Sequence, residues 1–123
     1  MTRPLVLVIE DNEANLYLMR FLLEKNGFDV ATARDGMAGI ELANRLAPAA
    51  ILLDIQLPAM SGYAVATELR KSPALSRVPI IAVTSFAMVG DRDRCLEAGA
   101  TDYVEKPIDP AGFVSKLRQH LTA

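Results

Sequence analysis

Five side chains able to bind a metal ion or a phosphoryl group follow short apolar runs in this sequence. They are Glu10 and Asp11 after residues 5–9, Asp54 after residues 51–53, Thr84 after residues 80–83, and Lys106 shortly after residues 103–104. Carboxylates held close together repel one another, and a divalent cation relieves that repulsion. Oxygen ligands favour a hard ion, Mg2+ or Mn2+, over zinc. An ammonium and a hydroxyl beside such a metal would stabilise the charge on a phosphoryl group in transfer.

Asp54 is the best candidate for the group that accepts the phosphoryl. A carboxylate nucleophile in such a site forms an aspartyl phosphate, and Asp54 ends the central apolar run. Each of the five residues alone also has an ordinary structural interpretation. Asp11 or Asn12, for example, would serve as the N-cap of the next helix. The expected convergence of all five side chains at one edge of a sheet is what favours a site.

The elements that must bring these side chains together are predicted from a repeating order of apolar run, turn and amphipathic stretch. The apolar runs begin near residues 5, 28, 50, 79 and 102. Three of them, Leu5–Ile9, Ala50–Leu53 and Ile80–Val83, are apolar without alternation, which is typical of parallel strands covered on both faces. The run Phe28–Thr32 is more polar and fits an edge strand. In such a sheet, ligands bind at the carboxyl ends of the strands.

Helical periodicity and helix-end signals place a helix after each run. The first is indicated by Leu16, Met19 and Leu23 and ends before Gly27; the second by Ile40, Ala43 and, less regularly, Leu46; the third by Val65 and Leu69, with Ser61 as N-cap; the fourth spans Asp91–Ala98 and ends at Gly99; the last begins at Asp109-Pro110 and carries Phe113, Val114, Leu117 and Leu121. Five strands alternating with five helices predict an α/β fold with a doubly wound parallel sheet, in one domain over residues 1–123.

Composition argues against several classes of function. A net charge of −2 over 123 residues offers no basic face for nucleic acid. The single Cys95 cannot form an internal disulfide, which fits a reducing compartment. The apolar run before Glu10 is too short for a signal peptide or a membrane span. We therefore expect a cytoplasmic protein that neither inserts into a membrane nor binds nucleic acid.

Taken in order, these residues resemble the receiver domain of two-component response regulators, the CheY-like superfamily. The motifs are Val8-Ile9-Glu10-Asp11-Asn12, Leu53-Asp54-Ile55-Gln56-Leu57-Pro58, Met60-Ser61-Gly62, Ala82-Val83-Thr84-Ser85, Gly99-Ala100 and Lys106-Pro107. The resemblance covers essentially the whole chain, and the ordered set is far more specific than any single motif. Residues 84–88 with Gly90-Asp91 are also similar to single-domain cell-cycle receivers of the DivK type and to receivers of hybrid histidine kinases. The family implies a flavodoxin-like five-stranded sheet in the order 2-1-3-4-5.

The resemblance also implies a role for each site residue. Asp54 would accept a phosphoryl group from a phosphohistidine on a histidine kinase or a histidine phosphotransfer protein, and Lys106 would contact the phosphoryl oxygens. The ligands of Mg2+ would be Glu10, Asp11, Asp54 and the backbone carbonyl of Gln56. Thr84 would move to hydrogen-bond the phosphoryl group, and Tyr103 would turn inward with it as a switch. The Lys106-Pro107 peptide bond would be cis.

Two features of the site distinguish this chain within the family it resembles. Glu10 stands where many relatives have Asp, and its longer side chain should still reach the metal ion, directly or through water. Gln56 and Phe86 lie two residues after Asp54 and Thr84, at positions that tune the lifetime of the phosphoryl group. The bulky Phe86 would obstruct an attacking water, so we expect slow self-dephosphorylation.

The expected output is binding of a target protein through the fourth helix, the fifth strand and the fifth helix of a monomer, with a dimer as the alternative. Such a protein is not an enzyme in the usual sense, because it catalyses only its own phosphorylation and dephosphorylation. Two rival functions remain. A pseudo-receiver would bind partners without phosphorylation, although none of the site residues is missing. A phosphotransferase of the haloacid dehalogenase type would need a second Asp as general acid where this chain has Gln56.

Overall fold

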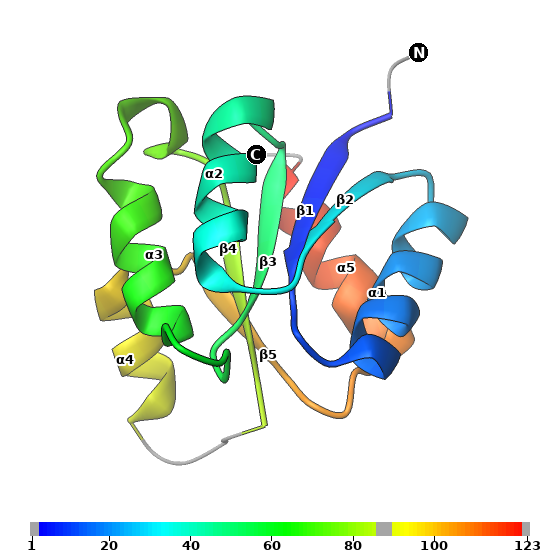
Figure 1. Cartoon of the computed structure of the whole chain (residues 1–123). Coiled ribbons are helices and arrows are strands. Elements are labelled where there is room, and N and C mark those ends of the chain that lie inside the picture. The colour runs from blue at the N-terminus through cyan, green and yellow to red at the C-terminus, as the bar shows by residue number, and fades with distance from the viewer. Residues whose placement is uncertain (1–2, 86–89, 122–123) are drawn as a thin grey trace.

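The computed structural model describes residues 3–85 and 90–121, and within these ranges five parallel strands form one sheet (Figure 1). The strands are β1 Leu5–Ile9, β2 Asp29–Ala33, β3 Ala50–Asp54, β4 Ile80–Thr84 and β5 Asp102–Glu105. Their order in the sheet is β2-β1-β3-β4-β5. The predicted flavodoxin-like order 2-1-3-4-5 is therefore confirmed, as are the positions of all five strands to within about two residues.

Helices cover both faces of the sheet, with α1 and α5 on one side and α2, α3 and α4 on the other (Figure 1). The helices are α1 Glu13–Lys25, α2 Gly36–Leu46, α3 Gly62–Arg70, α4 Asp91–Ala98 and α5 Pro110–Leu121, and a short 3-10 helix, η1, spans Pro73–Leu75. The five α-helices were predicted, whereas η1 was not. No helix in the described ranges is long and apolar enough to cross a membrane.

Two hydrophobic cores, one on each face, explain why the central strands are apolar without alternation. In β1, Leu7 and Ile9 belong to the core under α2 and α3, while Val6 and Val8 belong to the core under α1 and α5. All four side chains are fully buried. At the edge, β2 is only partly buried along most of its length, as its more polar sequence indicated.

The helix ends follow from local side-chain chemistry. The Asn12 side chain, rather than that of Asp11, caps α1 by accepting the N–H of Asn15 at 3.0 Å, which settles the open choice between them. Ser61 caps α3 as expected, and its Oγ accepts the N–H of Ala64. Gly99 ends α4 with φ +118°, a conformation that favours glycine. Leu46 is the last residue of α2, so the helix that it helped to indicate is confirmed, and its side chain is 38% exposed.

Candidate functional site

The carboxyl ends of β1 and β3 bring three carboxylates together, as the sequence predicted. Glu10 and Asp11 follow β1 and Asp54 is the last residue of β3, so parallel pairing of the two strands aligns their ends. One carboxylate oxygen from each of the three lies within 4.8 Å of the other two. Glu10 and Asp54 are buried and Asp11 is exposed, so the cluster opens to solvent on one side.

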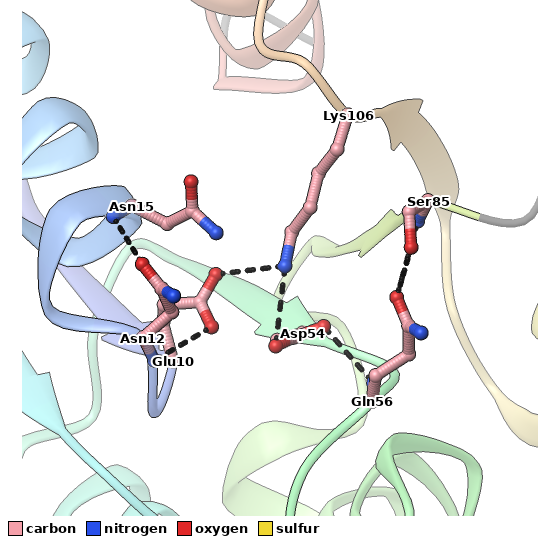
Figure 2. A network of polar contacts seen from close by, with 7 residues as sticks. All are labelled: Glu10, Asn12, Asn15, Asp54, Gln56, Ser85 and Lys106. Atoms are coloured by element: carbon pink, nitrogen blue, oxygen red, sulfur yellow. Dashed lines mark hydrogen bonds and ion pairs between the residues drawn. The ribbon is translucent and has the colours of Figure 1, made fainter.

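Lys106 contacts two of these carboxylates at once. Its Nζ lies 3.1 Å from Glu10 Oε1 and 3.3 Å from Asp54 Oδ2, between the two side chains (Figure 2). The backbone fixes this position, because the N–H of Lys106 donates to the carbonyl of Thr84 at 2.8 Å. The Lys106-Pro107 peptide bond is cis, which confirms the expectation. A single ammonium thus partly balances two buried negative groups.

Lys106 does not fully offset the cost of burying the Glu10 carboxylate, and the pKa of Glu10 shows this. Burial, together with the neighbouring Asp54, raises the pKa of its carboxyl to about 7, against an ordinary value of 4.5. Lys106 and the N–H of Asn12, which donates to Glu10 Oε2 at 3.2 Å, oppose that rise. Among the described residues, Glu10 Oε1 is the one buried side-chain oxygen or nitrogen that accepts no hydrogen bond of good geometry. Such an oxygen is well suited to a cation.

The donor set fits a hard divalent cation. Its side-chain ligands are all oxygens, from Glu10, Asp11 and Asp54, and Glu10 Oε1, which has an ion pair with Lys106 but no hydrogen bond, belongs to that set. Mg2+ binds in proteins through one or two carboxylates together with waters and phosphate oxygens. The exposed side of the cluster leaves room for those further ligands.

Thr84 and Tyr103 lie on neighbouring strands, β4 and β5. Thr84 ends β4 and its side chain is buried, one residue beyond the Asp54–Val83 pair of β3 and β4. Tyr103 lies in β5 opposite Ala82, and its ring is half-buried against the core under α2, α3 and α4. The register therefore places Thr84 beside Asp54 in the sheet, and Tyr103 on the edge strand two residues further from the carboxyl end than Thr84.

Gln56 has two separate contacts at the site. Its backbone N–H donates to Asp54 Oδ1 at 2.9 Å, which orients the carboxylate. Its side-chain Oε1 accepts the hydroxyl of Ser85 and, at 3.4 Å, the N–H of Ser85 (Figure 2). Ser85 follows Thr84 in a sequence motif, but no sequence pattern indicates a role for it, and only proximity in the fold reveals this contact. The other expected lifetime residue, Phe86, lies outside the described residues.

Comparisons with known proteins agree with this geometry. Residues 6–118 match the response regulator receiver domain family. The chain is 40% identical over 116 residues to the polar-differentiation response regulator DivK of Brucella anthropi, with 94% of each chain covered. The DivK protein of Brucella ovis matches with the same identity and coverage.

Solved structures show the same architecture. The receiver domain of a sensor histidine kinase from Pseudomonas aeruginosa superposes with a TM-score of 0.92 and 35% identity, covering 99% of this chain and 100% of that one, and its crystal structure has a magnesium ion coordinated in the active site cleft. A response regulator from Chloroflexus aurantiacus superposes with a TM-score of 0.95 over 99% of this chain and all of its own, at 24% identity, and supports the fold alone. With this fold, this acidic cluster and these relatives, the chain belongs to the response regulator receiver domain family.

Proposed function

We propose that this receiver domain carries a phosphoryl group on Asp54 within a two-component phosphorelay. The position of Lys106 Nζ, 3.3 Å from Asp54 and 3.1 Å from Glu10, carries the proposal. A cation in contact with a strand-end carboxylate is placed to bind the oxygens of a phosphoryl group transferred to that carboxylate. The acidic cluster beside it supplies the metal ligands that phosphoryl transfer requires.

In the proposed reaction, a carboxylate oxygen of Asp54 attacks the phosphorus of a phosphohistidine on the donor. The O–P bond forms while the N–P bond breaks, and the histidine nitrogen keeps the electron pair. The N–H of Gln56 holds the other carboxylate oxygen in place, and Lys106 turns from Asp54 toward the incoming phosphoryl oxygens. Mg2+ bound by Glu10, Asp11, Asp54 and the carbonyl of Gln56 would neutralise charge on the transferring group.

Readout of the phosphoryl group is assigned to Thr84 and Tyr103. A phosphate adds about 1.5 to 2 negative charges at pH 7, and Thr84 is the hydroxyl residue of β4. Movement of Thr84 would free space for the ring of Tyr103 on the adjacent strand. The repacked face of α4, β5 and α5 would then bind a target protein.

The proposed donor is a histidine kinase or a histidine phosphotransfer protein, and the proposed site of action is the cytoplasm. The DivK relatives are described as polar-differentiation regulators, which supports a role in the cell cycle. We expect the protein to act as a monomer, without nucleic acid and without membrane insertion.

The two rival functions fit the site less well. A haloacid-dehalogenase-type phosphotransferase needs an acid to protonate the leaving group. The carboxamide of Gln56 has no acidic proton, and its oxygen already accepts from Ser85. A pseudo-receiver gives no reason for a lysine held against two buried carboxylates.

Intact-protein mass spectrometry tests the proposed function. Incubation with a small phosphodonor and Mg2+ should add one phosphoryl group to the wild type and none to the Asp54→Asn variant. Thermal unfolding of both proteins in the same buffer shows that the variant is folded. Steady release of phosphate from ester substrates would favour the phosphotransferase, and an unmodified wild type would favour the pseudo-receiver.

A further inference from the structure

The backbone of Tyr103 is held at the free edge of the sheet by side chains rather than by another strand. Because β5 is the last strand of the sheet, one of its edges has no strand partner among residues 3–85 and 90–121. The N–H of Tyr103 donates to Asp102 Oδ1 at 2.7 Å, and its carbonyl accepts from Lys116 Nζ at 2.8 Å. Side chains commonly protect an edge strand in this way.

The ring of Tyr103 is contacted by cations from two helices. Lys116 of α5 places its Nζ 5.3 Å from the ring centroid, and Arg92 of α4 places its guanidinium carbon 5.9 Å from it. Both distances lie within the range of cation–π attraction. Tyr103 packs against the core under α2, α3 and α4, whereas α5 packs on the other core. Lys116 therefore meets this ring at the edge of β5, where its Nζ also contacts the Tyr103 carbonyl.

The side chain of Lys116 is held in place by the carboxylate of Asp102 on β5. Asp102 Oδ1 lies 3.6 Å from Lys116 Nζ, and Asp102 Oδ2 lies 3.0 Å from His120 Nε2 in the last turn of α5. Tyr103 and Lys116 also line a surface hollow of about 340 Å³ between β5 and α5. The ammonium therefore has carboxylate, carbonyl and ring partners on β5, all of them within two adjacent residues.

We propose that Lys116 is a positioning residue that holds Tyr103 at the β5 edge in the unphosphorylated protein. It thereby sets how much free energy phosphorylation of Asp54 must supply to move the Tyr103 switch. The proposal rests on the switch role proposed for Tyr103. In the structure the ring is only partly buried against the core under α2, α3 and α4. Rotation further inward would take it away from the Lys116 ammonium, so this contact favours the resting state. A ligand that favours the state with Tyr103 turned inward then binds more weakly, by the factor by which the Lys116 contact shifts the equilibrium toward the resting state.

Beryllofluoride with Mg2+, a mimic of the aspartyl phosphate, provides the measurement. In Lys116→Met, which keeps side-chain length but removes the charge, we expect about two- to fivefold tighter binding than in the wild type, the factor given by one exposed cation–π contact. The aromatic NMR signals of Tyr103 in the ligand-free protein should shift toward their beryllofluoride-bound positions. Tyr103→Phe identifies these signals among the three tyrosines of the chain.

Matched variants separate positioning from simple stabilisation of α5. Lys116→Arg keeps the cation and should bind beryllofluoride as the wild type does. Lys71→Met removes an exposed lysine that pairs with Glu68 of α3, and it should change neither readout. In a Tyr103→Leu background, Lys116→Met should no longer change the affinity.

Three results would overturn the proposal. They are unchanged Tyr103 signals and affinity in Lys116→Met, an effect that persists without the Tyr103 ring, and an equal effect from Lys71→Met. If Lys116→Met does not fold, Lys116→Ala takes its place with the same criteria. Should the wild type bind no beryllofluoride, the proposed function fails, and the Tyr103 signals of the ligand-free variants decide the role of Lys116 by themselves.

Discussion

At the scale of single residues, the site depends on polar groups that satisfy one another only because separate segments meet. Lys106 balances Glu10 and Asp54, and the N–H of Gln56 fixes one oxygen of Asp54. These contacts hold the carboxylate in a defined orientation before any ligand binds, and such preorganisation is what makes electrostatic stabilisation effective.

The contact between Gln56 and Ser85 predicts a coupled effect on phosphoryl lifetime. Ser85 holds the carboxamide of Gln56 between the loops after β3 and β4, so Ser85→Ala should free that side chain and admit water to the phosphoryl group. We expect roughly two- to tenfold faster loss of phosphate, since the net value of one such hydrogen bond is about 0.5–1.5 kcal/mol. Decay of the phosphorylated protein, followed by intact mass, measures the rate.

A double-mutant cycle identifies the partner through which Ser85 acts. Gln56→Ala and the Gln56→Ala/Ser85→Ala double variant should lose phosphate at the same rate. Additive effects of the two substitutions would contradict a shared action. Ser76→Ala is the control, since the Ser76 hydroxyl caps a carbonyl of η1, away from the site.

At the scale of elements, the start of α3 is pressed against the end of β3. A Cβ at Gly62 would lie 2.4 Å from the Cα of Ile55 and 2.6 Å from the carbonyl oxygen of Asp54, so the backbone itself demands glycine. The N–H of Gly62 also donates to the carbonyl of Ile55 at 2.9 Å. This close approach fixes the end of β3, where Asp54 lies, and the start of the loop that carries Gln56.

Gly62→Ala should therefore lower the free energy of unfolding by about 3 kcal/mol or more, within the range of severe backbone strain. Gly27→Ala is the matched comparison, because Gly27 has φ +92° but no atom within 4 Å of the added Cβ. Left-handed strain alone should cost it about 1–2 kcal/mol. Urea denaturation of the three proteins gives both values, and an equal loss in the two variants would contradict the steric argument.

The contacts of Asp102 on β5 with Lys116 and His120 on α5 predict that the stability of the fold depends on pH. Burial raises the pKa of the Asp102 carboxyl, but His120, the N–H of Tyr103 and Lys116 lower it by more together, so the folded pKa lies below the ordinary 3.8. A lowered carboxyl pKa contributes stability that is fully present above the unfolded pKa and is lost as the pH falls through the folded pKa.

Asp102→Asn should consequently be less stable than the wild type at pH 7, by about 1 kcal/mol for the loss of one charged hydrogen-bond partner. The difference should persist down to about pH 4 and shrink as the pH falls further below 3.8. Chemical denaturation at a series of pH values measures it. A difference that grows on acidification would contradict the assigned sign.

At the scale of the whole molecule, two buried cores hold the sheet in place, and the candidate site at the carboxyl ends of the strands lies outside both cores. The cores consist of buried apolar side chains on opposite faces of the sheet, while the buried polar residues Glu10, Asp54 and Thr84 gather at its carboxyl end. Close packing allows only small changes in the cores, so we expect a conformational response to be concentrated at that edge and at β5.

Binding of Mg2+ at the acidic cluster should stabilise the whole fold. A ligand that binds only the folded state adds about 2.7 kcal/mol when its concentration is 100 times its dissociation constant. The midpoint of thermal unfolding should rise with Mg2+ concentration in the wild type and much less in Asp54→Asn. Asp29→Asn, which alters an exposed carboxylate of β2, is the control and should respond as the wild type does. An equal rise in all three proteins would indicate a general salt effect.

The sequence by itself determined the element order and the residue types of the site. Apolar runs without alternation predicted strands buried on both faces, and cap residues such as Ser61 and Gly99 predicted the helix ends, because both signals are local. Strand ends in a parallel sheet share one edge, so the meeting of Glu10, Asp54 and Lys106 was also predictable, and the structure shows their contacts.

Tertiary structure alone decided which of these groups touch and with what effect. The choice of Asn12 over Asp11 as helix cap depends on backbone geometry, and the raised pKa of Glu10 depends on burial that no sequence pattern records. The contact of Ser85 with Gln56 and the reach of Lys116 around β5 to Tyr103 join residues far apart in the chain. Such contacts depend on how helices and strands pack, which is a property of the whole fold rather than of any segment.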